Sequence, residues 1–101
     1  MSRLYAIRYL RTAQQDLLEI FDYIARDDSA AAASLLESFD QTIARSATHP
    51  FLGAVPKDER LHRLGYRMVV VGKYLVFYVI KNEIVQIRRV LHGSRQYQFL
   101  L

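Results

Sequence analysis

The last third of the chain consists of apolar runs separated by short polar breaks. Residues 66–92 contain three runs rich in Val, Ile, Tyr and Phe, side chains that suit a pleated strand. The breaks, at residues 72–73 and 81–83, have the composition of hairpin turns, so the pattern predicts three strands in an antiparallel meander. The middle run, residues 74–80, lacks polar alternation, which is typical of a strand covered on both faces.

Two helices are predicted before this meander. In residues 13–24 apolar positions recur every three or four residues, and Thr12 with Gln15 has the spacing of a capping box. A second apolar stripe spans about residues 30–48, and the preceding residues 27–29 offer it an N-cap. Only a few residues separate the two helices, so we expect an antiparallel hairpin.

The remaining segments complete an α+β fold. Residues 4–9 are predicted to form a strand, residues 51–60 a loop, and residues 61–65 either the end of that loop or the start of the next strand. The helix hairpin is expected to pack on one face of the sheet. If successive elements alternate in direction, the first strand pairs antiparallel with the last. The apolar end of the tail after His92 is expected to fold back, and residues 1–101 are expected to form a single domain.

Charge is distributed unequally between the two halves of the chain. Residues 1–50 carry five Lys or Arg against seven Asp or Glu, a balance of −2, whereas residues 51–101 carry nine against three, a balance of +6. A basic half of this kind favours a polyanionic partner, either a nucleic acid or an acidic polypeptide.

The composition also excludes several classes of protein. The chain has no cysteine, which excludes disulfides and thiolate metal sites. Its first residues lack the apolar core of a signal peptide, and no apolar run approaches the ~20 residues that span a bilayer. We therefore expect a cytoplasmic location and no membrane partner.

Candidate chemistry is confined to basic and aromatic residues of the second half. The sequence has no glycine-rich phosphate loop, nucleophile elbow or metal-ligand pair at helical spacing, so neither a cofactor nor a metal is expected. Cleavage of RNA without a metal needs a proton acceptor, a proton donor and guanidinium groups that stabilise the phosphate. The candidate catalytic residues are Arg67, His92, Arg95 and Tyr97. The candidates for binding a target or a nucleic acid are Arg60, Arg63, Lys73 and Arg88.

The same residues fit structural roles as well. His92, at the end of a predicted strand, also fits a hydrogen-bonded structural residue, and the exposed arginines also fit solubility or partner binding. Tyr74, Phe77 and Tyr78 fit sheet packing better than stacking against bases. The residues alone leave these alternatives open.

Short motifs in a fixed order resemble the RelE/ParE superfamily, the toxins of type II toxin–antitoxin modules, which are also labelled plasmid stabilisation proteins. The motifs are AQQDLLEI at 13–20 with YI at 23–24, HP at 49–50 followed by Gly53, GYR at 65–67, GKYLVFY at 72–78 and RVLHGSR at 89–95. The resemblance implies a toxin that arrests bacterial growth and that a cognate antitoxin neutralises in a hetero-oligomer. An acidic antitoxin suits the basic half of the chain.

Two activities occur within this superfamily. RelE-like members are mRNA interferases that cleave mRNA in the ribosomal A site without a metal, whereas ParE-like members inhibit DNA gyrase. GYR, GKY and RVLH resemble the ParE branch more closely, so the resemblance implies gyrase inhibition, with ribosome-dependent mRNA cleavage as the alternative. Arg67, His92 and Arg95 match basic or imidazole positions of the nucleases, but no lysine here matches their catalytic lysines.

Overall fold

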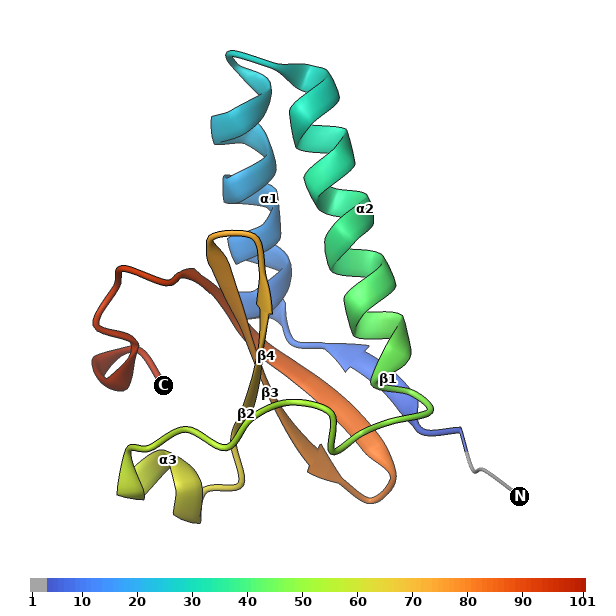
Figure 1. Cartoon of the computed structure of the whole chain (residues 1–101), viewed down its shortest axis with the longest axis vertical. Coiled ribbons are helices and arrows are strands. Elements are labelled where there is room, and N and C mark those ends of the chain that lie inside the picture. The colour runs from blue at the N-terminus through green and yellow to red at the C-terminus, as the bar shows by residue number, and fades with distance from the viewer. Residues whose placement is uncertain (1–3) are drawn as a thin grey trace.

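The computed structural model describes residues 4–101 and has the predicted α+β architecture (Figure 1). The elements, in order, are β1 (Ala6–Tyr9), α1 (Arg11–Ala25), α2 (Ser29–Arg45), α3 (Glu59–Arg63), β2 (Arg67–Val71), β3 (Tyr74–Lys81), β4 (Ile84–His92) and a short 3-10 helix, η1 (Tyr97–Phe99). Helices α1 and α2 form the predicted antiparallel hairpin, which projects beyond the sheet (Figure 1). Within residues 4–101, no helix is long and apolar enough to cross a membrane.

The sheet has the strand order β1-β4-β3-β2. Strands β2, β3 and β4 form the predicted antiparallel meander, and residues with positive φ occupy both turns, at Gly72 and at Asn82 and Glu83. The predicted antiparallel pairing of the first and last strands is wrong, because β1 runs parallel to β4. That prediction assumed that every connection reverses the chain. The long connection from α2 to β2 contains α3 and crosses the sheet, so strand direction does not alternate across it (Figure 1).

The starts of the helices agree only partly with the sequence prediction. Asp28 caps α2 as expected, since its Oδ1 accepts from the Ala31 amide at 3.0 Å. The prediction of a capping box at Thr12 and Gln15 is wrong. Helix α1 begins at Arg11 with no side-chain cap, and the Thr12 hydroxyl donates to the Arg88 carbonyl at 3.0 Å. A tertiary contact with the sheet thus replaces the local cap.

Residues 61–65 form neither of the predicted structures. Most of this segment belongs to α3, which begins after Asp58, whose carboxylate accepts from the Leu61 amide at 3.0 Å. Leu61 is fully buried and anchors α3 to the sheet face opposite the long helices. A buried leucine and a capping aspartate therefore make a helix of five residues stable here.

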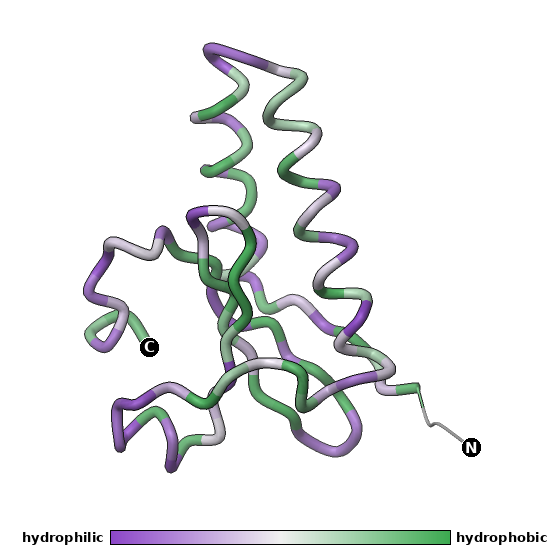
Figure 2. The backbone as a smooth tube through the Cα atoms, viewed as in Figure 1, coloured by the Kyte–Doolittle hydropathy of each residue, from purple (hydrophilic) through white to green (hydrophobic). Residues whose placement is uncertain are grey.

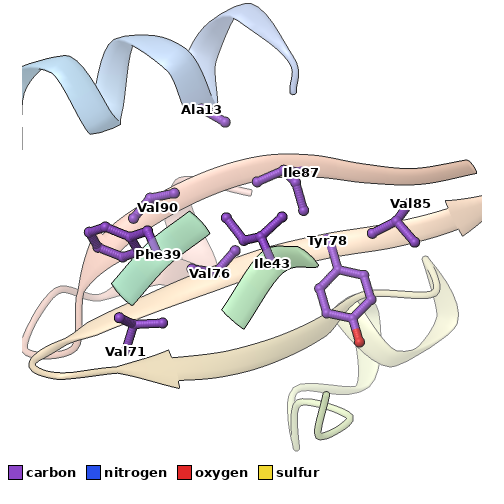
Figure 3. Packing of buried hydrophobic residues seen from close by; sticks show 9 residues of the cluster. All are labelled: Ala13, Phe39, Ile43, Val71, Val76, Tyr78, Val85, Ile87 and Val90. Atoms are coloured by element: carbon purple, nitrogen blue, oxygen red, sulfur yellow. The ribbon is translucent and has the colours of Figure 1, made fainter. Parts of the chain in front are cut away.

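The middle strand is covered on both faces, as its composition predicts. Val76 and Tyr78 point into a core cluster beneath α1 and α2 (Figure 3). Phe77 and Val79 belong to a second cluster with Leu61 on the opposite face. Leu100 and Leu101 pack against this second cluster, which confirms that the tail folds back. In Figure 2 strands β2 and β3 are hydrophobic over most of their length, whereas polar and apolar residues alternate along the helices.

Candidate functional site

Arg67, at the start of β2, is tied to the loop that follows α2. Its Nη1 donates to the carbonyls of Phe51, at 3.2 Å, and Gly53, at 2.8 Å. The guanidinium also lies over the Phe51 ring, 5.0 Å from the centroid. Three contacts with residues 51–53 therefore hold Arg67 in a bridging position.

Tyr78 fastens the same loop from inside the core. Its hydroxyl donates to the Pro50 carbonyl and accepts from the Gly53 amide, both at 2.8 Å. A Cβ at Gly53 would lie 2.7 Å from that hydroxyl and 2.9 Å from the Met68 carbonyl, so the position requires glycine. Burial raises the pKa of the Tyr78 phenol above its usual value. The sequence identified Tyr78 as a core residue but not this polar contact.

His92 lies at the end of β4, opposite Tyr74, with the ring centroids 5.4 Å apart in an edge-to-face arrangement. Its Nδ1 accepts from the Ser94 amide at 3.1 Å and lies 2.8 Å from the Ser94 hydroxyl. An amide N–H can only donate, so the neutral imidazole carries its proton on Nε2. Nε2 is then a hydrogen-bond donor and lacks the free lone pair that a general base needs.

A shallow cleft of about 180 Å³ lies between α1 and the end of β4. Two of the four candidate catalytic residues, His92 and Arg95, line it together. The other polar groups of the cleft come from α1 and β3, and they include Asp16, Glu19, Tyr23 and Tyr74. The cleft therefore contains carboxylates beside its basic groups.

The other two candidate catalytic residues lie elsewhere. The Tyr97 ring packs on Phe77 with centroids 4.9 Å apart, on the face of the sheet opposite the long helices. Arg67 pairs with Tyr78 in the ladder, whereas His92 pairs with Tyr74, four residues away along β3. At about 3.3 Å per residue this separation is ~13 Å, so the four residues do not converge on one point.

The four candidate binding residues are also dispersed. Arg60 donates to the carbonyl of Leu101, and Arg63 is exposed on α3. Lys73 is exposed in the turn between β2 and β3. Arg88, half-buried on β4, lies over the Tyr66 ring at 5.6 Å. Their roles in binding stay predictions.

The sequence did not identify an ion pair that joins α1 to the sheet. Asp16 is 8% exposed and accepts from Arg89 Nε and Nη2 at 2.8 and 2.9 Å, and from the Val90 amide at 2.9 Å. Hydrogen bonding to Asp16 raises the pKa of the Arg89 guanidinium. Arg89 also donates to the Leu100 carbonyl at 3.3 Å, so the pair reaches the tail. The one clue in the sequence was the position of Asp16, which lies three residues after the apolar Ala13 and therefore on the same side of the helix.

Asp16 substitutes for a neighbouring strand. Strand β1 pairs with β4 only as far as Ile87, and the Leu10 amide then donates to the Ile87 carbonyl at 2.9 Å. Beyond this point Asp16 accepts the hydrogen bond of the β4 backbone at Val90.

Among residues 4–101, no three His, Asp or Glu side chains are grouped so that they could hold a metal ion.

Comparison with known families identifies the chain. A model described as the ParE toxin of the type II toxin–antitoxin system parDE matches residues 7–97. The chain belongs to this family. The expected resemblance to the RelE/ParE superfamily is thus confirmed, and the ParE-family chain is a toxin of the type II class.

Solved structures similar to this ParE-family chain share its fold. A chain of the chromosomal ParDE toxin–antitoxin system from P. aeruginosa superposes with a TM-score of 0.72 at 18% identity, over 88% of this chain and 96% of that one. A chain of the RelBE2 toxin–antitoxin complex from Mycobacterium tuberculosis gives 0.63 at 22% identity, over 92% and 95%. Comparison with curated proteins finds no match.

Proposed function

We propose that this ParE-family toxin arrests bacterial growth by inhibiting DNA gyrase. The observation that carries the proposal is the dispersal of the groups that an RNase needs. His92 and Tyr97 pack on opposite faces of the sheet, and the Arg67 guanidinium donates hydrogen bonds to the carbonyls of Phe51 and Gly53. An inhibitor that acts by binding a protein does not need an acid and a base at hydrogen-bond distance from one substrate.

Exposed charge near the end of β4 supports a binding role. Arg95 and Lys73 are exposed, and the two segments meet where the Gly93 amide donates to the Lys73 carbonyl at 2.8 Å. We infer that this end of the sheet and the tail after His92 contact gyrase. Charged groups of this kind accelerate association and select the partner.

A cognate antitoxin is the second partner that we propose. Both similar solved structures are described as toxin–antitoxin systems or complexes. The excess of basic residues in the second half of the chain suits an acidic antitoxin segment. Co-expression with the neighbouring reading frame should restore growth and give a complex that co-purifies with the toxin; a frame that does neither would exclude that gene product as the antitoxin.

One observation favours ribosome-dependent mRNA cleavage as a second candidate. His92 and Arg95 line one cleft, so a hydrogen-bond donor and a guanidinium could meet the same phosphate. On this alternative, His92→Ala or Arg95→Ala abolishes message cleavage and leaves the fold intact, because both side chains line the cleft and neither is buried in the core.

The test is induction of the chain alone in bacteria, with DNA damage and message integrity followed in the same culture. Gyrase inhibition predicts the damage response, gyrase-linked linear DNA and intact message. Arg95→Ala should weaken growth arrest, whereas the matched Arg26→Ala, at the exposed end of α1, should leave it unchanged. Codon-spaced cuts that need translating ribosomes, without DNA damage, would replace the gyrase proposal with the alternative.

A further inference from the structure

Four side chains that donate hydrogen bonds lie together on the sheet face opposite the long helices. We call this group the donor patch; it consists of Arg8, Lys81, Gln86 and Arg88. Strand alternation places Arg8 on this face. Ile7 and Tyr9 pack against the helix-covered core, so Arg8 between them points to the opposite side of the sheet. The parallel ladder places Arg8 directly beside Gln86, and the antiparallel ladder places Val79, from the second cluster, on its other side.

Arg88 and Gln86 are already oriented toward each other. Arg88 Nη2 donates to Gln86 Oε1 at 3.1 Å, and the guanidinium lies over the Tyr66 ring. The buried Nε of Arg88 has no hydrogen-bond partner within residues 4–101. Because the Gln86 oxygen is occupied by Arg88, its amide NH₂ remains to donate. The patch therefore contains two guanidinium groups, one ammonium and one amide donor.

The patch contains no acidic group. On the described strands, the positions next to the patch on this face include Ala6, Phe77, Val79 and Ile84, and none of these is acidic. The nearest acidic residue in sequence, Glu83, lies in the turn between β3 and β4. Neither Arg8 nor Lys81 forms an ion pair within residues 4–101. An anion would supply the charge that the protein does not.

We propose that the donor patch binds the sugar–phosphate backbone of a nucleic acid. Standard strand spacing places the Cα atoms of Arg8 and Arg88 about 8 Å apart, close enough for both side chains to reach one phosphate. Tyr66 is 5% exposed and lies beneath Arg88, so it offers no surface for a base to stack on. Binding is therefore directed at phosphate and is independent of base sequence.

An acidic polypeptide fits this surface less well. A bound peptide normally adds apolar anchors to its charges, and these need exposed apolar pockets. Val79 is buried and Ile84 is half-buried beside the donor patch, so no such pocket is present among the neighbouring described residues. The inference goes beyond gyrase inhibition, because it assigns the toxin a direct contact with nucleic acid on its own surface.

The test is the affinity of the purified full-length chain for a labelled 20-base-pair duplex at several salt concentrations. Each phosphate contact contributes a slope of about −0.9 to log K against log salt, so Arg8→Gln with Lys81→Gln should reduce the slope by about 1.8. Both side chains are exposed, so this variant should fold as the wild type does. Arg88→Gln should reduce the slope further, and Arg26→Gln, which removes one charge at the hairpin tip, should not change it. A single-stranded RNA competitor distinguishes DNA from RNA as the source of the phosphate.

An unchanged slope in both donor-patch variants would overturn the inference. A wild-type chain that binds labelled polyglutamate but does not bind the duplex at 50 mM salt would also overturn it. Gyrase inhibition is measured on the same samples. A chain that binds the duplex and does not inhibit gyrase supports this inference and contradicts the proposed function. A chain that inhibits gyrase without binding the duplex supports the proposed function and contradicts this inference.

Discussion

Nine side chains are buried between the two long helices and the face of the sheet that they cover, whereas the opposite face is covered by a five-residue helix and the C-terminal tail. The first cluster contains Phe39 and Ile43 from α2 together with residues from all three strands of the meander (Figure 3). The second depends on Leu61 from α3 and on partly buried tail residues, among them Tyr97 and Leu100. The first face thus has a continuous core, and the second has a thinner cover.

The cover of the second face depends on charged side chains as well as on apolar contacts. Arg89 and Arg60 donate to the carbonyls of Leu100 and Leu101 and hold the end of the tail. Exposed hydrogen bonds and few buried apolar contacts are typical of regions that open at low free energy. We infer that the first face determines the stability of the fold and that the second face, with its tail, is available to partners.

Phe39→Ala should have the largest effect on stability. Phe39 is 1% exposed, and the truncation of such a ring costs about 3 to 5 kcal/mol, a large part of the stability of a small domain. Urea denaturation measures this loss. A loss below about 1 kcal/mol would contradict the assignment of the main core to the helix-covered face.

Asp16→Asn should come next, because Asp16 links α1 to β4. The substitution leaves the Arg89 guanidinium without its carboxylate and weakens the bond to the Val90 amide, at an expected cost of about 2 to 3 kcal/mol. Arg89 also holds the tail, so limited trypsin digestion should cut faster after Arg95. Asp22→Asn, which changes an exposed aspartate of α1 in the same way, is the matched control. Equal cutting rates in both variants would contradict the link between Asp16 and the tail.

Gly53→Ala should destabilise the loop between α2 and α3 by about 1 to 3 kcal/mol, because the added Cβ collides with the Tyr78 hydroxyl and the Met68 carbonyl. Combination with Tyr78→Phe removes the nearer of these two atoms. The double variant should therefore lose less stability than the sum of the single variants. If the stability losses of the two single variants add strictly, the Tyr78 hydroxyl is not the atom that the added Cβ displaces.

Tyr78→Phe should cost about 1 to 2 kcal/mol at neutral pH, since it leaves the Gly53 amide and the Pro50 carbonyl without their partner. Burial raises the pKa of Tyr78 in the folded chain, so its contribution is fully present below pH 10 and is lost as the pH rises through the folded value. The wild type should lose stability above pH 10, and Tyr78→Phe should lose less. Because burial also raises the pKa of Tyr9, the stability of the variant should still depend on pH to some extent above pH 10.

Tyr97→Ala should have the smallest effect on stability, about 1 kcal/mol, because its ring is partly exposed and packs mainly on Phe77. Its effect on growth arrest should be large by comparison, since the tail is our proposed contact with gyrase. Urea denaturation and a growth assay on the same variant measure both. Full growth arrest by Tyr97→Ala would contradict that role of the tail.

Periodicity was sufficient to predict the strands of the meander, the helix hairpin and the two covered faces of β3. It failed where a tertiary contact replaced a local one. The Thr12 hydroxyl bonds to the sheet and not to its own helix, and α3 is too short for its apolar spacing to be recognised. Strand direction depends on the long connection before β2, whose path no local pattern specifies.

The candidate site was predicted less well than the fold. His92 and Tyr97 were both candidate catalytic residues, but the chain turns after β4 and places the two rings on opposite faces. The Asp16–Arg89 pair joins residues 73 positions apart, and a single sequence contains little information about such a contact. An aspartate at a core-facing helical position is the one local clue to it.

The most direct test of the central claim is gyrase-catalysed supercoiling of relaxed plasmid by purified components, with and without this chain and in the absence of ribosomes. Our account predicts that the chain blocks supercoiling and traps linear DNA bound covalently to gyrase, and that excess antitoxin reverses the block. Unimpaired supercoiling by gyrase, together with message cleavage when ribosomes are supplied to the same preparation, would contradict it.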